Sequence, residues 1–155
     1  GFDPRFQFAY SDDTKKSNSN GKYPFLDNIA SQGNTLYHLR LGEIYLVKAE
    51  AEARSTNGDL SVALDNLNEI RNRAGVAPKE LSDKATLLED IRQEKLLELF
   101  FENGEGWFDI VRYDVLGNLK ASDVKPTVTS NNQFVLPMPS QVIIGNNAII
   151  QNKGY

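Results

Sequence analysis

The stretch between Asp59 and Gly75 constrains the fold more than any other part of the chain. Asp59 is placed to accept hydrogen bonds from the free amides of a first helical turn. Gly75 stands where helices commonly end in the left-handed conformation, and Pro78 follows it. The apolar residues in between recur at the i, i+3, i+4, i+7 spacing of an amphipathic helix, namely Leu60, Ala63, Leu64, Leu67, Ile70 and Ala74. We therefore predict a helix over residues 60–74.

A second helical pattern lies just upstream of the first. Its apolar members are Leu41, Ile44, Tyr45, Ala49 and Ala53. The pattern breaks at residues 55–58, Ser-Thr-Asn-Gly, which are turn-forming residues. Because the connection is so short, the two segments predict a helical hairpin over residues 37–75.

Further helices are predicted within residues 84–116. One runs from about Leu87 to Glu102, because Thr86 and Glu89 have the spacing of a capping box and Gly104 follows the last turn. A shorter helix is expected to begin at Trp107.

The shorter helix that begins at Trp107 is expected to extend to about Asp114, with its end marked by Gly117. Residues 117–155 predict an irregular tail. Within this tail, residues 134–139 are expected to be extended, since a proline disfavours the helical conformation of the residue before it. A final short turn of helix is expected to begin at Ser140.

The N-terminal part has a different character. Phe6, Phe8 and Tyr10 alternate with other residues at a strand-like spacing, and residues 11–22 form a polar stretch typical of an exposed loop. The predicted fold class is therefore mainly α, with a helical hairpin, further helices and a long irregular C-terminal tail.

Composition narrows the possible functions. The chain has 155 residues, about one domain, with no cysteine and one histidine, which excludes disulfide scaffolds, thiol nucleophiles and cysteine-bearing metal sites. The formal net charge is −4, and residues 76–114 alone carry five basic and ten acidic residues. An acidic balance of this kind argues against a nucleic-acid partner. No apolar run reaches the length of a membrane span, and residues 1–4 lack the features of a signal peptide.

Three glutamates offer the clearest chemical hypothesis. Glu94, Glu98 and Glu102 stand at i, i+4 and i+8, so a helix would place them on one face. Two such acids can form a glycosidase pair if they flank a cleft and their pKa values differ. The favoured interpretation is a polar face that forms ion pairs with Arg92, Lys95 or the basic residues of a neighbouring helix.

Other candidate sites are weaker in their chemistry. His38 lacks a nearby nucleophile motif, so a hydrogen-bonded histidine near a helix start is favoured over a triad or a zinc ligand. Residues 104–109 contain part of a dinucleotide-binding pattern, but they follow a helix and not a strand. Residues 12–21 have several oxygen-bearing side chains, but these lack the spacing of a calcium-binding loop, so a solvated loop is favoured. Trp107 and Phe108 suit a sugar-stacking platform, although core packing is favoured.

No catalytic residue, metal ligand or cofactor is predicted, and the residues indicate a binding or scaffold domain.

Three stretches together resemble the SusD/RagB family. Residues 39–51 and 67–75 are similar to R-L-A-E-x-Y-L-x-x-A-E-A and L-N-x-I-R-x-R-A-G. Residues 91–112 are similar to I-x-x-E-R-x-x-E-L-x-F-E-G-x-R-W-F-D-L-x-R. Residues 136–155 resemble the ending L-P-I-P…N-P…Q-N-P-G-Y.

Shorter matches and departures accompany these motifs. Asp3-Pro4-Arg5 and Lys22-Tyr23 fall where the family often has D-x-R and K-Y. Gly106 replaces the arginine before the tryptophan, with one extra residue in that turn. Lys95 replaces the arginine of E-R. The tail departs from the family at Val142, Asn147 and Lys153.

The resemblance implies a SusD-like α/α superhelix in which residues 37–75 are a tetratricopeptide-like hairpin. In that design Ala63 is small where two helices approach, and Leu67 fills the groove one turn later. Residues 1–155 would be the C-terminal domain of a longer protein, with residues 84–116 as further helices and residues 117–155 as the irregular tail.

The implied function is non-enzymatic capture of an oligosaccharide or a peptide at the cell surface, and its delivery to a SusC-like TonB-dependent transporter in the outer membrane. The membrane would be reached only through an N-terminal lipid anchor that is absent from this chain. Ligand contacts are not carried over from the family; Tyr10 and Tyr23, which flank the polar loop, are candidates. A helical-repeat scaffold for protein interactions is the alternative function, and a glycoside hydrolase using Glu94 or Glu98 is the third.

Overall fold

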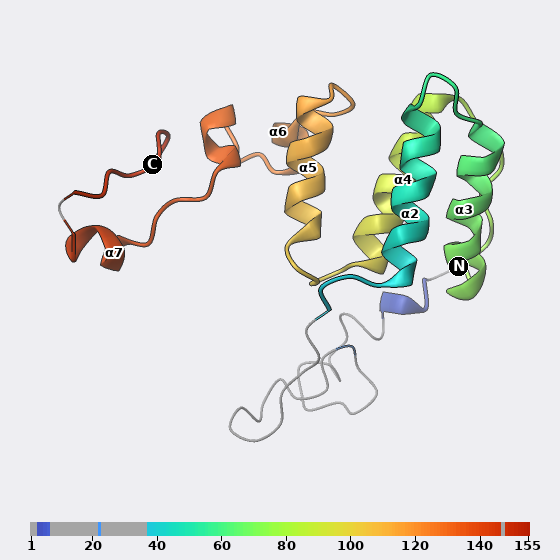
Figure 1. Ribbon diagram of the computed structural model, residues 1–155, viewed down its shortest axis with the longest axis horizontal. Coiled ribbons are helices and arrows are strands. Elements are labelled where there is room, and N and C mark those ends of the chain that lie inside the picture. The colour runs from blue at the N-terminus through green and yellow to red at the C-terminus, as the bar shows by residue number, and fades with distance from the viewer. Residues whose placement is uncertain (1–2, 7–21, 23–36, 147) are drawn as a thin grey trace. The chain divides into compact units, whose positions relative to one another are not determined.

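The computed structural model describes residues 3–6, 22, 37–146 and 148–155, and every regular element in them is helical (Figure 1). No strand occurs in these ranges, so the predicted mainly α class is confirmed. The elements are α2 (Leu41–Arg54), α3 (Leu60–Arg73), α4 (Lys84–Glu98), α5 (Glu105–Val115), α6 (Ala121–Val124), the 3₁₀ turn η1 (Asn131–Phe134) and α7 (Ser140–Ile144).

The helical hairpin forms as its turn residues predict. The Asp59 side chain accepts a hydrogen bond from the Ser61 amide at 2.8 Å and caps α3, as expected. Gly75 ends the segment with a φ of 71°. In the connection, a Cβ on Gly58 would lie 1.9 Å from the carbonyl oxygen of Glu52, so only glycine fits there.

Helices α2, α3 and α4 lie side by side and contact one another (Figure 1). Their shared core contains the fully buried side chains of Leu46, Ala49, Ala63, Leu67, Leu87 and Ile91. Alanines at two of these positions let the helix backbones approach closely. Burying each of the larger aliphatic side chains stabilises the fold by roughly 1.5–3 kcal/mol relative to exposure.

The buried face of α2 is offset from the predicted one. Leu41 is 71% exposed and Ile44 is 44% exposed, whereas Leu46 and Ala49 are buried. The apolar spacing identified the helix correctly. The residues predicted for its buried face come from two faces, because α2 carries apolar residues on both. Its outer apolar face continues at Val47, which is 47% exposed.

The predicted bounds of α4 are wrong at both ends. Asp83, and not the predicted capping box, caps the helix by accepting hydrogen bonds from the amides of the first turn, including the Thr86 amide at 3.1 Å. Glu89 does not reach back to the cap; it accepts hydrogen bonds from Arg92 instead.

The far end of α4 stops at Glu98, earlier than the expected Glu102. Phe101, Asn103 and Gly104 have φ values of 61°, 46° and 77°, and these left-handed conformations cannot continue a right-handed helix. The residues between the two helices therefore form a compact turn.

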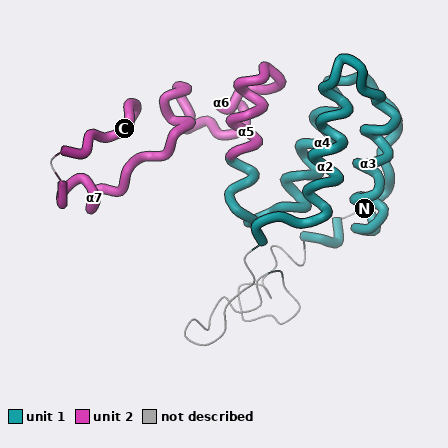
Figure 2. Tube along the Cα trace, in the orientation of Figure 1, with its two compact units in different colours: residues 1–107 teal, residues 108–155 magenta. Residues whose placement is uncertain are grey.

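The chain divides into two compact units, residues 1–107 and residues 108–155 (Figure 2). In the second unit, α7 begins at Ser140 as predicted. Val135 is extended as expected, but Phe134 belongs to η1 and is not. The side chain of Gln151 holds the backbone of Met138 on both sides, accepting from its amide at 2.8 Å and donating to its carbonyl at 3.1 Å.

The strand-like N-terminal pattern is wrong where it can be compared. Arg5 and Phe6 lie in a helical turn, and the Phe6 amide donates to the Asp3 carbonyl at 3.1 Å. Phe8 and Tyr10 lie outside the described residues.

Candidate functional site

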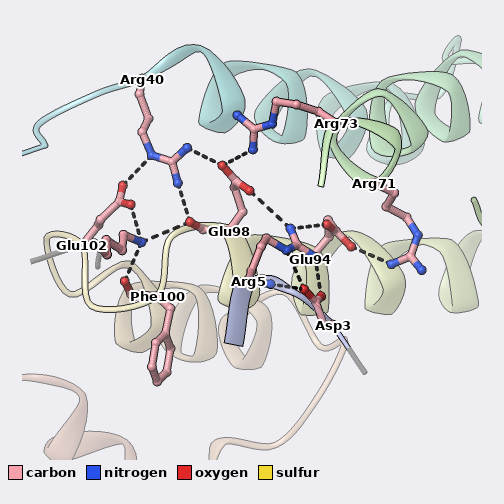
Figure 3. A network of polar contacts seen from close by, with 10 residues as sticks. Asp3, Arg5, Arg40, Arg71, Arg73, Glu94, Glu98, Phe100 and Glu102 are labelled. Carbon is pink, nitrogen blue, oxygen red and sulfur yellow. Dashed lines mark hydrogen bonds and ion pairs between the residues drawn. The ribbon is translucent and has the colours of Figure 1, made fainter. Parts of the chain in front are cut away.

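The three glutamates of the sequence hypothesis do lie together, and they are buried in a polar network (Figure 3). Glu94 is only 1% exposed. It accepts hydrogen bonds from Arg5 at 2.6 Å and from Arg71 at 2.7 Å. Both of its oxygens are therefore held by guanidinium groups from distant parts of the chain.

Glu98 is the centre of the network. It forms ion pairs with Arg40, at the start of α2, and with Arg73, in the last turn of α3. Arg5 approaches its second oxygen at 3.2 Å. Although burial alone would raise the pKa of Glu98, hydrogen bonds from Arg73 and Arg40 outweigh it and lower the pKa to about 2.

Glu102, in the turn after α4, completes the row. It pairs with Arg40 at 2.8 Å and with Lys22 at 2.5 Å. Lys22 also donates to the carbonyl oxygen of Phe100 at 2.7 Å, which ties it to the same turn. Burial lowers the pKa of this lysine against the opposing effect of Glu102.

The N-terminal segment joins the network through an internal brace. Arg5 pairs with Asp3 at 2.7 Å while it reaches Glu94. The Arg5 hydrogen bond lowers the pKa of Asp3. The network thereby connects residues 3–5 to α4 across 89 positions of sequence.

This arrangement bears on the hydrolase hypothesis. A glycosidase acid must hold a proton near neutral pH, which requires a raised pKa. Glu98 has a lowered pKa and is enclosed by arginines, so it cannot supply that proton. The favoured interpretation of an ion-paired face is confirmed, since Arg71 and Arg73 of the neighbouring helix α3 pair with Glu94 and Glu98. Arg92 pairs with Glu89 instead.

The remaining sequence candidates do not assemble with this network. The His38 side chain is exposed, and its carbonyl accepts from the Asn103 amide group at 3.2 Å. Gly104 forms a helix-ending turn, as predicted for the partial dinucleotide pattern. Tyr10, Tyr23 and residues 12–21 lie outside the described residues. In the part of the chain that the structure describes, no group of three or more His, Cys, Asp or Glu side chains is arranged to hold a metal ion.

Aromatic residues near the end of α4 form a hollow, in a region where the sequence analysis favoured core packing over a stacking platform. A hollow of about 230 Å³ opens there, with Phe100, Phe101 and Trp107 among its lining residues. Phe101 is 63% exposed. Phe108, for which core packing was favoured, is instead 59% exposed, so that prediction is wrong. The sequence signals for the hollow were the aromatic density of residues 100–108 and the Trp107–Phe108 pair considered as a stacking platform.

The comparisons with known proteins explain why these motifs occur together. The model of the SusD family matches residues 13–155. The chain belongs to the SusD family. No curated protein sequence matches this SusD-family chain. Among the described residues, no helix is long and apolar enough to cross a membrane.

Two solved structures resemble this SusD-family chain. A SusD-like protein from Bacteroides fragilis NCTC 9343 shares 25% identity, with a TM-score of 0.57 and 87% of this chain covered. A SusD superfamily protein from Parabacteroides distasonis ATCC 8503 also shares 25% identity, with a TM-score of 0.62 and 84% coverage. In both cases the match spans about 30% of the solved chain. The fold class and the resemblance inferred from the sequence are thus confirmed.

Proposed function

We propose that this chain is part of a non-catalytic binding protein that captures oligosaccharide, or peptide, at the cell surface and delivers it to a SusC-like TonB-dependent transporter. The proposal includes an outer-membrane location through a lipid anchor on the longer protein. Family membership over residues 13–155 is the observation that carries it, since SusD-like proteins are generally binding proteins in nutrient uptake.

The geometry of the glutamate row supports a non-catalytic role. Glu94, Glu98 and Glu102 are all occupied by arginine or lysine side chains, and the row acts as a brace between segments. A rigid helical frame of this kind suits a protein whose ligand specificity lies in loops. Tyr10 and Tyr23 stay candidates for ligand contact.

The test uses the full-length protein. Affinity electrophoresis through gels that contain neutral plant or microbial polysaccharides should retard it, and the polysaccharide should be recovered uncleaved. Copurification with a TonB-dependent transporter is the second expected result. Full-length variants Tyr10→Ala and Tyr23→Ala then measure whether either tyrosine contributes. The proposal is refuted if no polysaccharide retards the protein and no peptide binds it. It is also refuted if the glycan is cleaved.

A helical-repeat scaffold is the second candidate function. The outer face of α2 favours it, because Leu41, Ile44 and Val47 expose apolar surface that a partner could cover. A scaffold predicts that the full-length protein copurifies with a partner other than a transporter and retains that partner when glycan is absent.

A further inference from the structure

The hollow beside the end of α4 has the composition of a small ligand site. Its apolar lining residues are Leu96, Leu99, Phe100, Phe101 and Trp107. At about 230 Å³ it is smaller than the roughly 300–1,000 Å³ of sites for drug-sized ligands. One ring-sized chemical group fits a space of this size.

The turn that shapes the hollow is fixed by its own hydrogen bonds. The Glu102 amide donates to the Leu99 carbonyl at 2.9 Å, and the Trp107 amide donates to the Gly104 carbonyl at 2.9 Å. Lys22 donates to the Phe100 carbonyl at 2.7 Å. In Figure 3 the Phe100 ring points away from the ion-pair network. The aromatic rings are therefore carried by a backbone that is already ordered.

Phe101 is held in an unfavourable backbone conformation. Its φ of 61° is rare for a bulky residue, and such conformations cost of order 1–3 kcal/mol each. Its ring lies 4.2 Å from that of Phe100, centroid to centroid, yet it is largely exposed. The fold accepts backbone strain in order to present an aromatic face outward.

Gly106 keeps the hollow open. A Cβ at this position would lie 3.2 Å from Cδ1 of Leu96, so the wall is already in close contact with the backbone. The motif to which residues 91–112 are similar has an arginine before the tryptophan, whereas this chain has glycine. A long side chain here would have to enter the space that the aromatic rings surround.

The charged groups of the hollow are carboxylates, which accept hydrogen bonds. Glu102 and Glu105 are its only charged lining residues, and Glu102 is already neutralised by Lys22 and Arg40. Anions are therefore disfavoured, while hydroxyl groups can donate to the carboxylates and C–H faces can stack on the rings.

We propose that this hollow is a subsite for one neutral sugar ring of an oligosaccharide, with Phe101 and Trp107 as its stacking surfaces and Glu105 as a hydroxyl acceptor. The inference rests on the proposed function and assigns it a place in this chain. Pockets that bind such ligands are mostly apolar with a few polar groups that orient the ligand, and the hollow has that character.

The chain offers a direct optical test. Trp107 is its sole tryptophan, so its fluorescence reports on this hollow. The 155-residue chain is titrated separately with maltohexaose, mannohexaose, xylohexaose, the anionic hexagalacturonate and the cationic hexalysine. We expect a saturable change in emission with at least one neutral hexasaccharide, and at least tenfold weaker responses to the two charged probes.

Two variants remove the site in different ways. Gly106→Arg fills the hollow, and Phe101→Gly removes the ring while relieving the strained backbone, because glycine adopts positive φ freely. Each should weaken sugar binding at least tenfold. Leu97→Ala is the matched control on the same helix outside the lining, and it should bind within twofold of wild type. Since Phe101→Gly is not expected to unfold the chain, its result stands even if Gly106→Arg misfolds.

The outcomes separate this inference from the proposed function. It is overturned if no neutral hexasaccharide changes Trp107 emission, if hexalysine binds more tightly than the sugars, or if both variants bind like wild type. The same variants in the full-length protein extend the test. Full-length protein that binds glycan equally well with and without Phe101→Gly would reject the subsite and leave the proposed function standing, whereas absence of all glycan and peptide binding would reject the proposed function.

Discussion

At the scale of single residues, Glu98 illustrates how burial and pairing act together. Its carboxylate is surrounded by Arg40, Arg73 and Arg5. Removing one partner of a buried ion pair costs roughly 3–5 kcal/mol, because the remaining charges lose their compensation. Since Arg73 is about half exposed, Glu98→Gln should lower the free energy of unfolding by about 3 kcal/mol, the lower end of that range. Urea denaturation at pH 7 measures the change.

A more exposed pair supplies the control. Asp90 and Lys79 lie 2.6 Å apart, and the lysine is 40% exposed. Asp90→Asn should cost less than about 1 kcal/mol, because exposed ion pairs contribute little. If both variants lose the same free energy of unfolding, the buried network contributes no more to stability than an exposed ion pair.

The pH dependence of stability follows from the same residue. The pKa of Glu98 is lowered from 4.5 to about 2 by folding, so the unfolded chain binds the proton more readily. The stabilisation is complete above pH 4.5 and is lost as the pH falls toward 2. Wild type and Glu98→Gln should therefore differ most at neutral pH and converge in acid. Urea midpoints measured between pH 7 and pH 2.5 test this, and a constant difference across that range would contradict it.

At the scale of secondary-structure elements, the core between helices depends on a few side chains. Leu67 of α3 is fully buried. Leu67→Ala should reduce the free energy of unfolding by about 2–5 kcal/mol, through lost burial and the cavity that remains. Leu97, which is 41% exposed on α4, is the matched leucine, and Leu97→Ala should change stability by at most about 0.5 kcal/mol. Thermal or urea unfolding distinguishes the two.

The irregular tail has an element of its own, the clamp formed by Gln151 on Met138. Prolines on either side of Met138 have no amide to donate, so the Met138 amide is the donor within the segment Pro137–Pro139. Gln151→Ala removes its acceptor. A hydrogen bond contributes about 0.5–1.5 kcal/mol, so the amide should exchange with solvent roughly two to twelve times faster. Lys153→Ala, outside the clamp, should leave this exchange rate unchanged.

Sequence reasoning succeeded where the determinants are local. The helix over residues 60–74, its Asp59 cap and its Gly75 end depend on neighbouring residues, and all three are confirmed. The cap of α4 was misassigned because Thr86 lies only three residues after Asp83, and both are good capping residues.

The candidate site depended on contacts that local patterns do not encode. Glutamate spacing predicted the acidic face, but its partners are 23 to 93 positions away. The aromatic hollow requires the left-handed conformation of Phe101, which tertiary structure imposes on a residue that disfavours it.

At the scale of the whole molecule, the outer face of α2 is the feature that most needs explanation. Leu41, Ile44 and Val47 recur every three residues and stay exposed. The solved relatives are longer, since this chain matches about 30% of each. One helical-repeat unit cannot bury both of its apolar faces, so the other face needs a neighbouring segment or a partner to cover it. We expect the full-length protein to cover this face.

The absence of cysteine from the 155 residues makes that expectation measurable. A cysteine introduced as Val47→Cys should react readily with a maleimide in the 155-residue chain, and at least ten times more slowly in the full-length protein. Leu97→Cys, which is similarly exposed in the isolated chain, is the control. Its labelling rates in the two proteins show how much the added segments slow the reaction at another helix face. Equal labelling rates for Val47→Cys in the two proteins would show that the face remains open, and it would then favour an external partner as the group that covers α2.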